Sequence, residues 1–252
     1  MTQIPTPPWR KQRRSTPTRK PLSREQILDA AMGILDAEGL DAMSMRRVAD
    51  ELGTGPASLY AHVANKDDLL ELVRERVIGE IPLPVPDPEL WREQLHQLAA
   101  DSVRVLAAHR DIARAWLATV PTGYNALRIA ETMLGILLVG GVPPRIAAIA
   151  VDRIALYISA DAYENALWRG RYEGRAAEEF FAEEIGQITE FYRNLPPGEF
   201  PHLTANVDFL TSGDGDERFA FGMQMLIRAL ETHLPARGSE LSAPADPPGP
   251  PG

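Results

Sequence analysis

The sequence of 252 residues contains no cysteine, which excludes disulfide bonds, thiolate metal sites and cysteine nucleophiles. It also lacks any apolar run of the roughly 18 to 20 residues that a membrane-spanning helix needs. The basic N-terminus is not followed by the apolar segment of a signal peptide. Common enzyme motifs (G-x-S-x-G, the P-loop, G-x-G-x-x-G and H-E-x-x-H) are absent as well. We therefore expect a cytoplasmic protein without membrane contact, enzymatic activity or a cofactor.

The net charge of −9 is distributed unevenly along the chain. Residues 1–22 hold six basic side chains and no acidic one, whereas residues 81–252 hold fourteen basic and twenty-three acidic side chains. A basic start on an acidic body indicates that only the N-terminal part meets an anionic partner. We expect residues 1–20 to form a basic disordered arm, and residues 236–252, which are rich in proline and glycine, to form a disordered tail.

Helical spacing of apolar residues dominates the rest of the chain, and convincing strand alternation is absent. This pattern predicts an all-α fold with about ten helices. Ser23 and Gln26 form a capping box that opens the first helix. The apolar residues that follow are spaced as on the buried face of a helix, and they are Ile27, Leu28, Ala31, Ile34 and Leu35.

Four prolines within residues 81–88 indicate a boundary between two domains of unequal size. The smaller domain comprises residues 21–81 and the larger one residues 82–235. Within the larger domain, residues 196–215 are interpreted as a long loop. The helices expected there span residues 88–108, 111–119, 122–140, 144–171, 175–195 and 216–234.

Residues 44–63 have the form of a helix-turn-helix motif. A helix that begins after Ser44 is followed by a glycine-bearing bend and by a second short helix over 57–63, with Pro56 at its first position. In this motif the second helix enters the major groove of DNA. The competing interpretation is a plain pair of packed helices. The side chains suited to contact phosphates or base edges are those of Arg46, Arg47, Thr54, Gly55, Pro56, Ala57, Ser58, Tyr60, His62 and Lys66.

Four longer motifs extend this pattern: I-L-x-A-A from Ile27, R-x-V-A-x-x-L-G from Arg46, S-L-Y-x-H-V from Ser58 and N-K-x-x-L-L from Asn65. Through them, residues 22–73 closely resemble the N-terminal domain of the TetR family of transcriptional regulators. The body resembles the tetracycline-repressor-like C-terminal domain more weakly. The resemblance implies an N-terminal three-helix helix-turn-helix DNA-binding domain, followed by a larger helical ligand-binding and dimerisation domain.

The resemblance also implies a function, namely a homodimeric repressor that binds a palindromic operator and is released by a small-molecule inducer. The expected dimer helices, 144–171 and 216–234, carry broad apolar faces, and a two-fold protein requires related half-sites. Two alternatives stay open: a helical small-molecule carrier, and a regulator that responds to no ligand. The arm formed by residues 1–20 either lies in the minor groove or is a solvated leader.

A ligand pocket in the body is implied by the resemblance. Where the tetracycline repressor holds the drug's magnesium ion through a histidine, this sequence has Trp116, so we expect no metal site and an apolar or aromatic inducer. Each candidate residue has the alternative interpretation of ordinary core. The candidate lining comprises Trp116, Thr119, Met133, Leu137, Tyr157, Asp161, Glu164 and Trp168.

Overall fold

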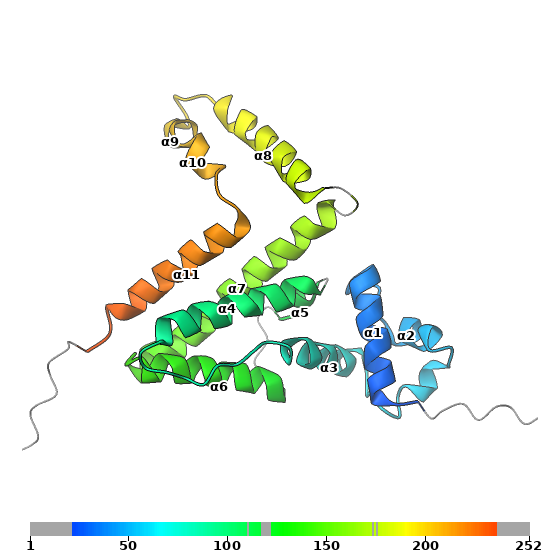
Figure 1. Cartoon of the computed structure of the whole chain (residues 1–252). Coiled ribbons are helices and arrows are strands. Elements are labelled where there is room, and N and C mark those ends of the chain that lie inside the picture. Colours follow the sequence, from blue (N-terminus) through cyan, green and yellow to red (C-terminus); the bar gives the residue numbers. More distant parts are fainter. Residues whose placement is uncertain (1–21, 110, 117–121, 173, 175, 236–252) are drawn as a thin grey trace, which may run out of the picture.

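The structure, a computed structural model, describes residues 22–109, 111–116, 122–172, 174 and 176–235. Among these residues every regular element is a helix, which confirms the all-α prediction (Figure 1). No helix in this part of the chain combines the length and the apolar character needed to cross a membrane. The predicted arm and tail, 1–20 and 236–252, lie outside the described residues.

Three helices form a head at the N-terminal end of the described chain: α1 (Arg24–Glu38), α2 (Met45–Glu51) and α3 (Lys66–Ile78). The predicted capping box is present, because the Ser23 hydroxyl accepts the Gln26 backbone N–H at 3.2 Å while the Gln26 side chain accepts the Ser23 N–H at 3.0 Å. Helix α1 packs against both α2 and α3. The fully buried core of the head includes Ile27, Leu35, Val48, Ala49, Leu59, Leu69 and Val73.

The second helix of the helix-turn-helix motif is shorter and tighter than predicted. Instead of an α-helix over 57–63, the chain forms the 3-10 helix η1 (Pro56–Ser58) and then continues in turns. The backbone N–H groups of Ser58, Leu59 and His62 donate to carbonyl groups three residues earlier, which is the 3-10 pattern rather than the α-helical one. The buried side chains of Leu59 and Val63 nevertheless hold the segment in the core of the head.

The body is built from α4 (Trp91–Ala108), α5 (Ile112–Trp116), α6 (Tyr124–Val139) and the long helix α7 (Pro144–Tyr172), which packs against the other three (Figure 1). Helix α4 begins three residues later than predicted. The Asp87 carboxylate accepts the Glu89 backbone N–H at 2.8 Å and holds a turn ahead of the helix. The last helix, α11 (Gly215–Glu231), returns to pack on α4 and α7.

Helices α8 (Ala177–Arg193), α9 (Pro201–Ala205) and α10 (Val207–Leu210) form a protrusion that stands away from the body in Figure 1. The predicted loop over 196–215 is therefore wrong, because α9 and α10 lie within it. Leu203 and Val207 are four residues apart, a helical spacing that the proline and glycine content of the segment obscures. Val207 is buried on α10, which contacts α8.

Candidate DNA-binding head and sensor body

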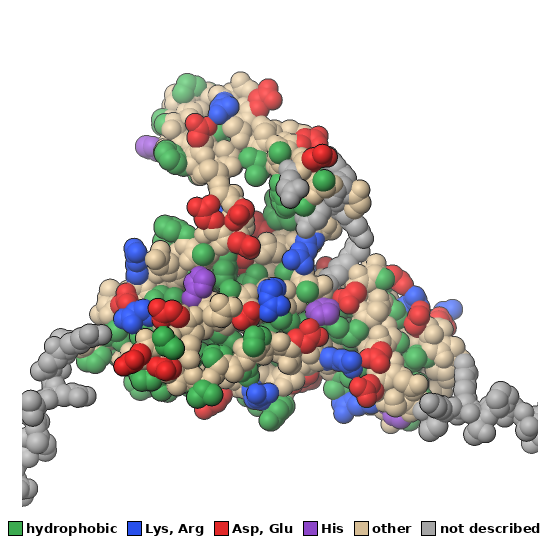
Figure 2. All heavy atoms as spheres, viewed as in Figure 1, with side chains coloured by type: hydrophobic (Ala, Val, Ile, Leu, Met, Phe, Trp, Pro, Cys, Tyr) green, Lys and Arg blue, Asp and Glu red, His purple; other side chains and the backbone are tan. Residues whose placement is uncertain are grey.

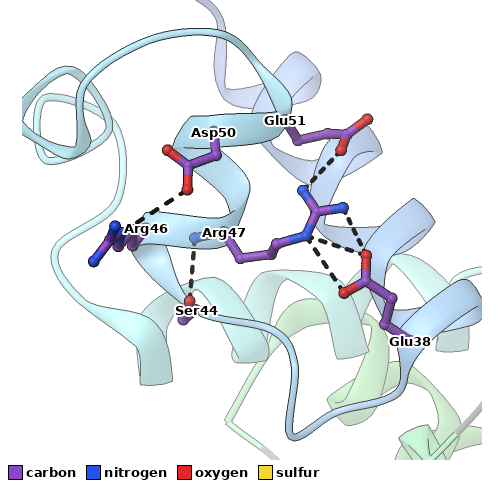
Figure 3. Close-up of polar contacts among 6 residues, drawn as sticks. All are labelled: Glu38, Ser44, Arg46, Arg47, Asp50 and Glu51. Carbon is purple, nitrogen blue, oxygen red and sulfur yellow. Dashed lines mark hydrogen bonds and ion pairs between the residues drawn. The ribbon is translucent and has the colours of Figure 1, made fainter.

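Arg46 lies on the solvent side of α2 (Figure 3). The Ser44 hydroxyl caps this helix by accepting the Arg47 backbone N–H at 3.1 Å, and the next two residues, Val48 and Ala49, are fully buried. The Arg46 side chain is 87% exposed, and its nearest acidic oxygen, on Asp50, is 3.9 Å away. A guanidinium in this position is free to bind a phosphate or the edge of a guanine.

The neighbouring Arg47 is held by two carboxylates instead (Figure 3). Its guanidinium donates to Glu38 at the end of α1, at 2.6 Å, and to Glu51 at the end of α2, at 2.8 Å. These hydrogen bonds raise the pKa of the Arg47 guanidinium further above its usual range, and they lower the pKa of Glu38. Arg47 therefore ties two helices of the head together rather than projecting freely.

The segment from the bend to the start of α3 presents its polar side chains to solvent. Gly53 ends α2 with a φ of +59°, a conformation that favours glycine. The Thr54 hydroxyl donates to the Ser58 hydroxyl at 3.1 Å, and the Tyr60 side chain is 55% exposed. The predicted DNA-contact residues that are exposed here are Gly55, Pro56, Ala57, Ser58, Tyr60, His62 and Lys66.

A seam of polar contacts joins the head to the body, and its first member is His109 at the end of α4. The His109 ring nitrogen Nδ1 lies 3.1 Å from the Asp36 carboxylate on α1, and Nε2 lies 3.8 Å from the carboxylate of Glu80. The His109 side chain is only 15% exposed. The imidazole therefore sits between two acidic groups where α1 and α4 meet.

The seam continues along α5, which follows α4 directly. The Asp111 carboxylate accepts the Leu40 backbone N–H at 3.1 Å, and Arg114 donates to Asp41 at 3.0 Å. Asp111 has a φ of +60°, a left-handed conformation that aspartate tolerates better than most residues. These contacts join residues 71 and 73 positions apart in sequence. The sequence gave no sign of this role.

The predicted pocket residues fall into three environments. Met133 and Leu137 of α6 are 2% and 0% exposed and belong to the central apolar core. Trp116, at the end of α5, is partly buried and packs against the same core. Thr119 lies outside the described residues.

The second environment is the contact between α7 and α11. The Tyr157 hydroxyl donates to the Phe219 carbonyl at 3.2 Å, and the two rings stack with their centroids 5.3 Å apart. One turn further along α7, Asp161 lies among the negative charges of Glu164 and Asp216. Tyr157 and Asp161 therefore lie at the contact between α7 and α11.

The third environment is the corner between α7 and α8, where Trp168 lies. Its ring contacts those of Phe180 and Phe181, with centroids 6.3 and 5.7 Å away, and the Arg171 guanidinium sits 4.8 Å from the Trp168 ring. Trp168 thus joins the protrusion formed by α8 to α10 to the body. In the described part of the chain, no three His, Asp or Glu side chains come together as a metal-binding group.

We expect the substitution Asp161→Asn to stabilise the protein at neutral pH. Burial, reinforced by the charges of Glu164 and Asp216, raises the pKa of Asp161 to about 6. This value lies above that of an unfolded aspartate, so the ionised carboxylate opposes folding above about pH 6, and the opposition fades as the pH falls from 6 towards 4. Because the side chain is only half-buried, solvent screening limits the effect to about 1 kcal/mol, or about 2–4 °C in Tm.

Thermal unfolding of Asp161→Asn and wild type at pH 7.5 and at pH 4 checks this expectation. The variant should be more stable at pH 7.5, and most of the difference should be lost at pH 4, where the carboxyl group of folded Asp161 is protonated. A difference of the same size at both pH values would show that the carboxylate charge is not its cause.

The comparisons with known proteins agree with this architecture. Residues 83–234 match the family described as "Tetracyclin repressor-like, C-terminal domain", and residues 27–73 match "Bacterial regulatory proteins, tetR family". The HTH-type transcriptional repressor DrrR1 of Streptomyces coeruleorubidus is 31% identical over 242 residues, which cover 94% of this chain and 87% of that protein. The tetracycline repressor protein class D of Escherichia coli is 28% identical over 218 residues, which cover 85% and 92%.

A solved structure with a similar fold is that of the Streptomyces coelicolor TetR family protein ActR in complex with actinorhodin. It shares 37% sequence identity with a TM-score of 0.77, covering 87% of this chain and 100% of that chain. The two family matches together span the head and the body, and the relatives are regulators rather than enzymes. The chain therefore belongs to the TetR family of transcriptional regulators.

Proposed function

We propose that the chain is a homodimeric repressor that binds a palindromic operator in the cytoplasm and leaves it when a small-molecule inducer binds. Residues 21–81 form the DNA-binding domain in this proposal, and residues 82–235 form the ligand-binding and dimerisation domain. The observation that carries it is the row of exposed polar side chains from α2 to α3, on a head that polar contacts tie to α5.

The exposed row divides by chemistry into base and phosphate contacts. Arg46 is placed to bind a guanine or a phosphate bidentately, and the apolar surfaces of Pro56 and Ala57 suit a thymine methyl group. Tyr60, the 55% exposed aromatic, is suited to donate to a phosphate. Thr54, Gly55 and Ser58 complete the surface facing the groove, with His62 and Lys66 as further phosphate contacts. Arg47, held by two carboxylates, supports the surface from behind.

The dimer in this proposal forms through α7 and α11. One face of α11 is buried within the protomer, with Phe219 and Met223 5% and 0% exposed, whereas Phe221 and Met225 are 61% and 56% exposed. The latter two are four residues apart and therefore share a second, uncovered apolar face. Figure 2 shows that hydrophobic side chains also reach the surface elsewhere on the body and on the protrusion formed by α8 to α10. A second copy that covers this face of α11 removes Phe221 and Met225 from water.

The inducer in this proposal is apolar or aromatic and binds beside Trp116. This partly buried indole ends α5, and the head is held by Asp111, just before this helix, and by Arg114 within it. A ligand that moves α5 therefore acts on the orientation of the head, provided that it binds the displaced conformation more tightly. Support for a small-molecule ligand also comes from ActR, whose structure was solved in complex with actinorhodin.

The proposal is tested by selecting bound fragments from a random DNA pool with the purified protein, using an Arg46→Ala, Tyr60→Ala double variant as the control. We expect wild type to recover a palindrome that the double variant loses. Planar aromatic compounds are then screened for release of the selected duplex, first with wild type and then with Trp116→Ala. No enrichment at low salt would contradict DNA binding and favour a small-molecule carrier. Enrichment without release by any compound would favour a regulator that senses no ligand.

Deleting residues 1–20 is expected to weaken operator binding and flatten its dependence on salt. This segment holds six basic side chains and no acidic one, and each phosphate contact adds about 0.9 to the slope of log K against log salt. We expect the slope to fall by about 2 to 5 per protomer in a titration of binding against salt concentration. Deletion of residues 236–252 is the control and should leave the slope unchanged. An unchanged slope without residues 1–20 would show that the arm does not touch phosphates.

A further inference from the structure

Helix α3 belongs to the head and to the body at once. Its side chains Leu69 and Val73 are fully buried, the helix packs against α1 in the head, and it also contacts α4, α5 and α6 in the body. The orientation of the head is therefore set by whatever fixes α3 against the body. Hydrogen bonds with defined directions add to apolar packing in fixing the rotation of a helix about its axis.

Such bonds converge on Glu75, which lies on α3 and is partly buried. Its carboxylate accepts the backbone N–H of Asn125 at 2.7 Å and that of Ala126 at 3.1 Å. In return, the Asn125 side chain donates to the Glu75 carbonyl at 2.9 Å. Three hydrogen bonds thus join one residue of α3 to the first turn of α6.

The Glu75 carboxylate caps the N-terminus of α6. The N-cap residue, Gly123, offers no side chain to the free N–H groups, so Glu75 caps the helix from outside. A negative charge here also complements the positive end of the helix dipole. A Cβ atom on Gly123 would lie 2.1 Å from a Glu75 carboxylate oxygen, so glycine is needed for the approach.

Two further contacts hold the same side of α3. The Thr122 hydroxyl donates to Glu71 at 3.1 Å, and Arg74 donates to the Ala115 carbonyl of α5 at 3.0 Å. Glu71, Arg74 and Glu75, which lie within about one turn of α3, therefore all bind the body. Of the three, Glu75 alone receives two backbone N–H groups of another helix.

We propose that Glu75 is a positioning residue that sets the angle of the head on the body, and thereby the spacing of operator half-sites that the dimer accepts. This inference rests on the proposed function, because the spacing is defined only for two heads on a palindrome. Loss of the carboxylate leaves the recognition surface unchanged and loosens its angle. The protein then binds a half-site as before but discriminates poorly between spacings.

The test uses the full chain and duplexes that carry the half-sites selected by wild type, with the spacer shortened or lengthened by one and two base pairs. Each base pair rotates one half-site against the other by about 34°. We expect wild type to prefer its best spacer by about tenfold or more over the others, and Glu75→Ala to retain a preference of about threefold or less. Gly123→Ala, which displaces the carboxylate, should behave like Glu75→Ala.

The matched control is Asp87→Ala. Asp87 also accepts two backbone N–H groups, from Glu89 at 2.8 Å and from Leu90 at 3.4 Å, but it does so in the turn just ahead of α4, within the body. We expect Asp87→Ala to keep the wild-type spacing profile even if its Tm falls. Glu75→Gln retains an acceptor oxygen and should give an intermediate profile, so the inference stays testable if Glu75→Ala does not fold.

A wild-type spacing preference that Glu75→Gln and Gly123→Ala keep unchanged would overturn this inference and leave the proposed function intact. A loss of Tm without any change in the spacing profile would likewise reduce Glu75 to a structural role. If wild type selects no palindrome, the proposed function and this inference fall together. The binding curves together with thermal unfolding of the same variants distinguish these three results.

Discussion

Replacing Arg46 with alanine is expected to lower operator affinity by about 10- to 100-fold, the range for loss of a bidentate base contact. The Tm should not change, because the side chain is 87% exposed and its closest carboxylate, that of Asp50, is 3.9 Å away. Removal of the exposed guanidinium therefore separates DNA binding from folding. Titration of the selected duplex by fluorescence anisotropy, together with thermal unfolding, measures both quantities.

Arg47→Ala is the matched control, because it removes the same side chain from the adjacent position. Arg47 pairs with Glu38 and Glu51, so its loss should lower the Tm and leave two carboxylates facing one another without a cation (Figure 3). Its effect on affinity should be the smaller one. Arg46→Lys adds a further distinction: it keeps a phosphate contact but loses bidentate recognition of a guanine. Equal losses of affinity and Tm in Arg46→Ala and Arg47→Ala would contradict a direct contact of Arg46 with DNA.

Local sequence signals predicted the parts of the fold that local chemistry determines. The capping box of Ser23 and Gln26 and the cap at Ser44 form as expected, because each depends on residues three positions apart. The short helices were harder to predict. Residues 57–63 have the composition of an α-helix, yet their backbone closes mainly in 3-10 turns, and the apolar pair Leu203 and Val207 lies within a segment otherwise typical of a loop.

The exposed recognition surface could also be predicted, since its residues are contiguous in sequence. Leu59 and Val63 face inward at a spacing of four, which leaves Ser58, Tyr60 and His62 on the outside. Arg46 and Arg47 show the limit of this reasoning. Two adjacent arginines look equivalent in a sequence, but the difference between them depends on Glu38, which is nine residues away and belongs to another helix.

The seam between head and body was beyond prediction, because its partners are far apart in sequence. His109, Asp111 and Arg114 meet the head through contacts that span more than seventy residues, and Glu75 meets α6 across fifty. No periodicity encodes such pairs. The candidate pocket residues lie in three separate environments for a related reason. Helical spacing identifies the inward face of α7, but it does not identify which neighbouring helix each turn of this 29-residue helix contacts.

The largest loss of stability is expected from Gly140→Ala. Gly140 ends α6 with helical backbone angles, so alanine causes no backbone strain there. Its Cβ atom would lie 2.5 to 2.9 Å from three ring atoms of Trp91, which is only 2% exposed. The indole has little freedom to move, because Arg92 stacks on it at 4.7 Å and pairs with Glu231 of α11. Overpacking of this kind costs about 2–3 kcal/mol, which corresponds to a Tm decrease of about 4–12 °C.

Gly33→Ala makes the same chemical change where the structure predicts the opposite sign. Gly33 lies in the middle of α1, and a Cβ atom there would meet no atom within 4 Å. Alanine is favoured over glycine in a helix by up to about 1 kcal/mol, so the Tm should rise by about 2–4 °C. Differential scanning calorimetry of both variants compares two added methyl groups that differ only in their surroundings. If Gly140→Ala leaves Tm unchanged or raises it, the contact between Gly140 and Trp91 does not limit the packing of α4 against α6.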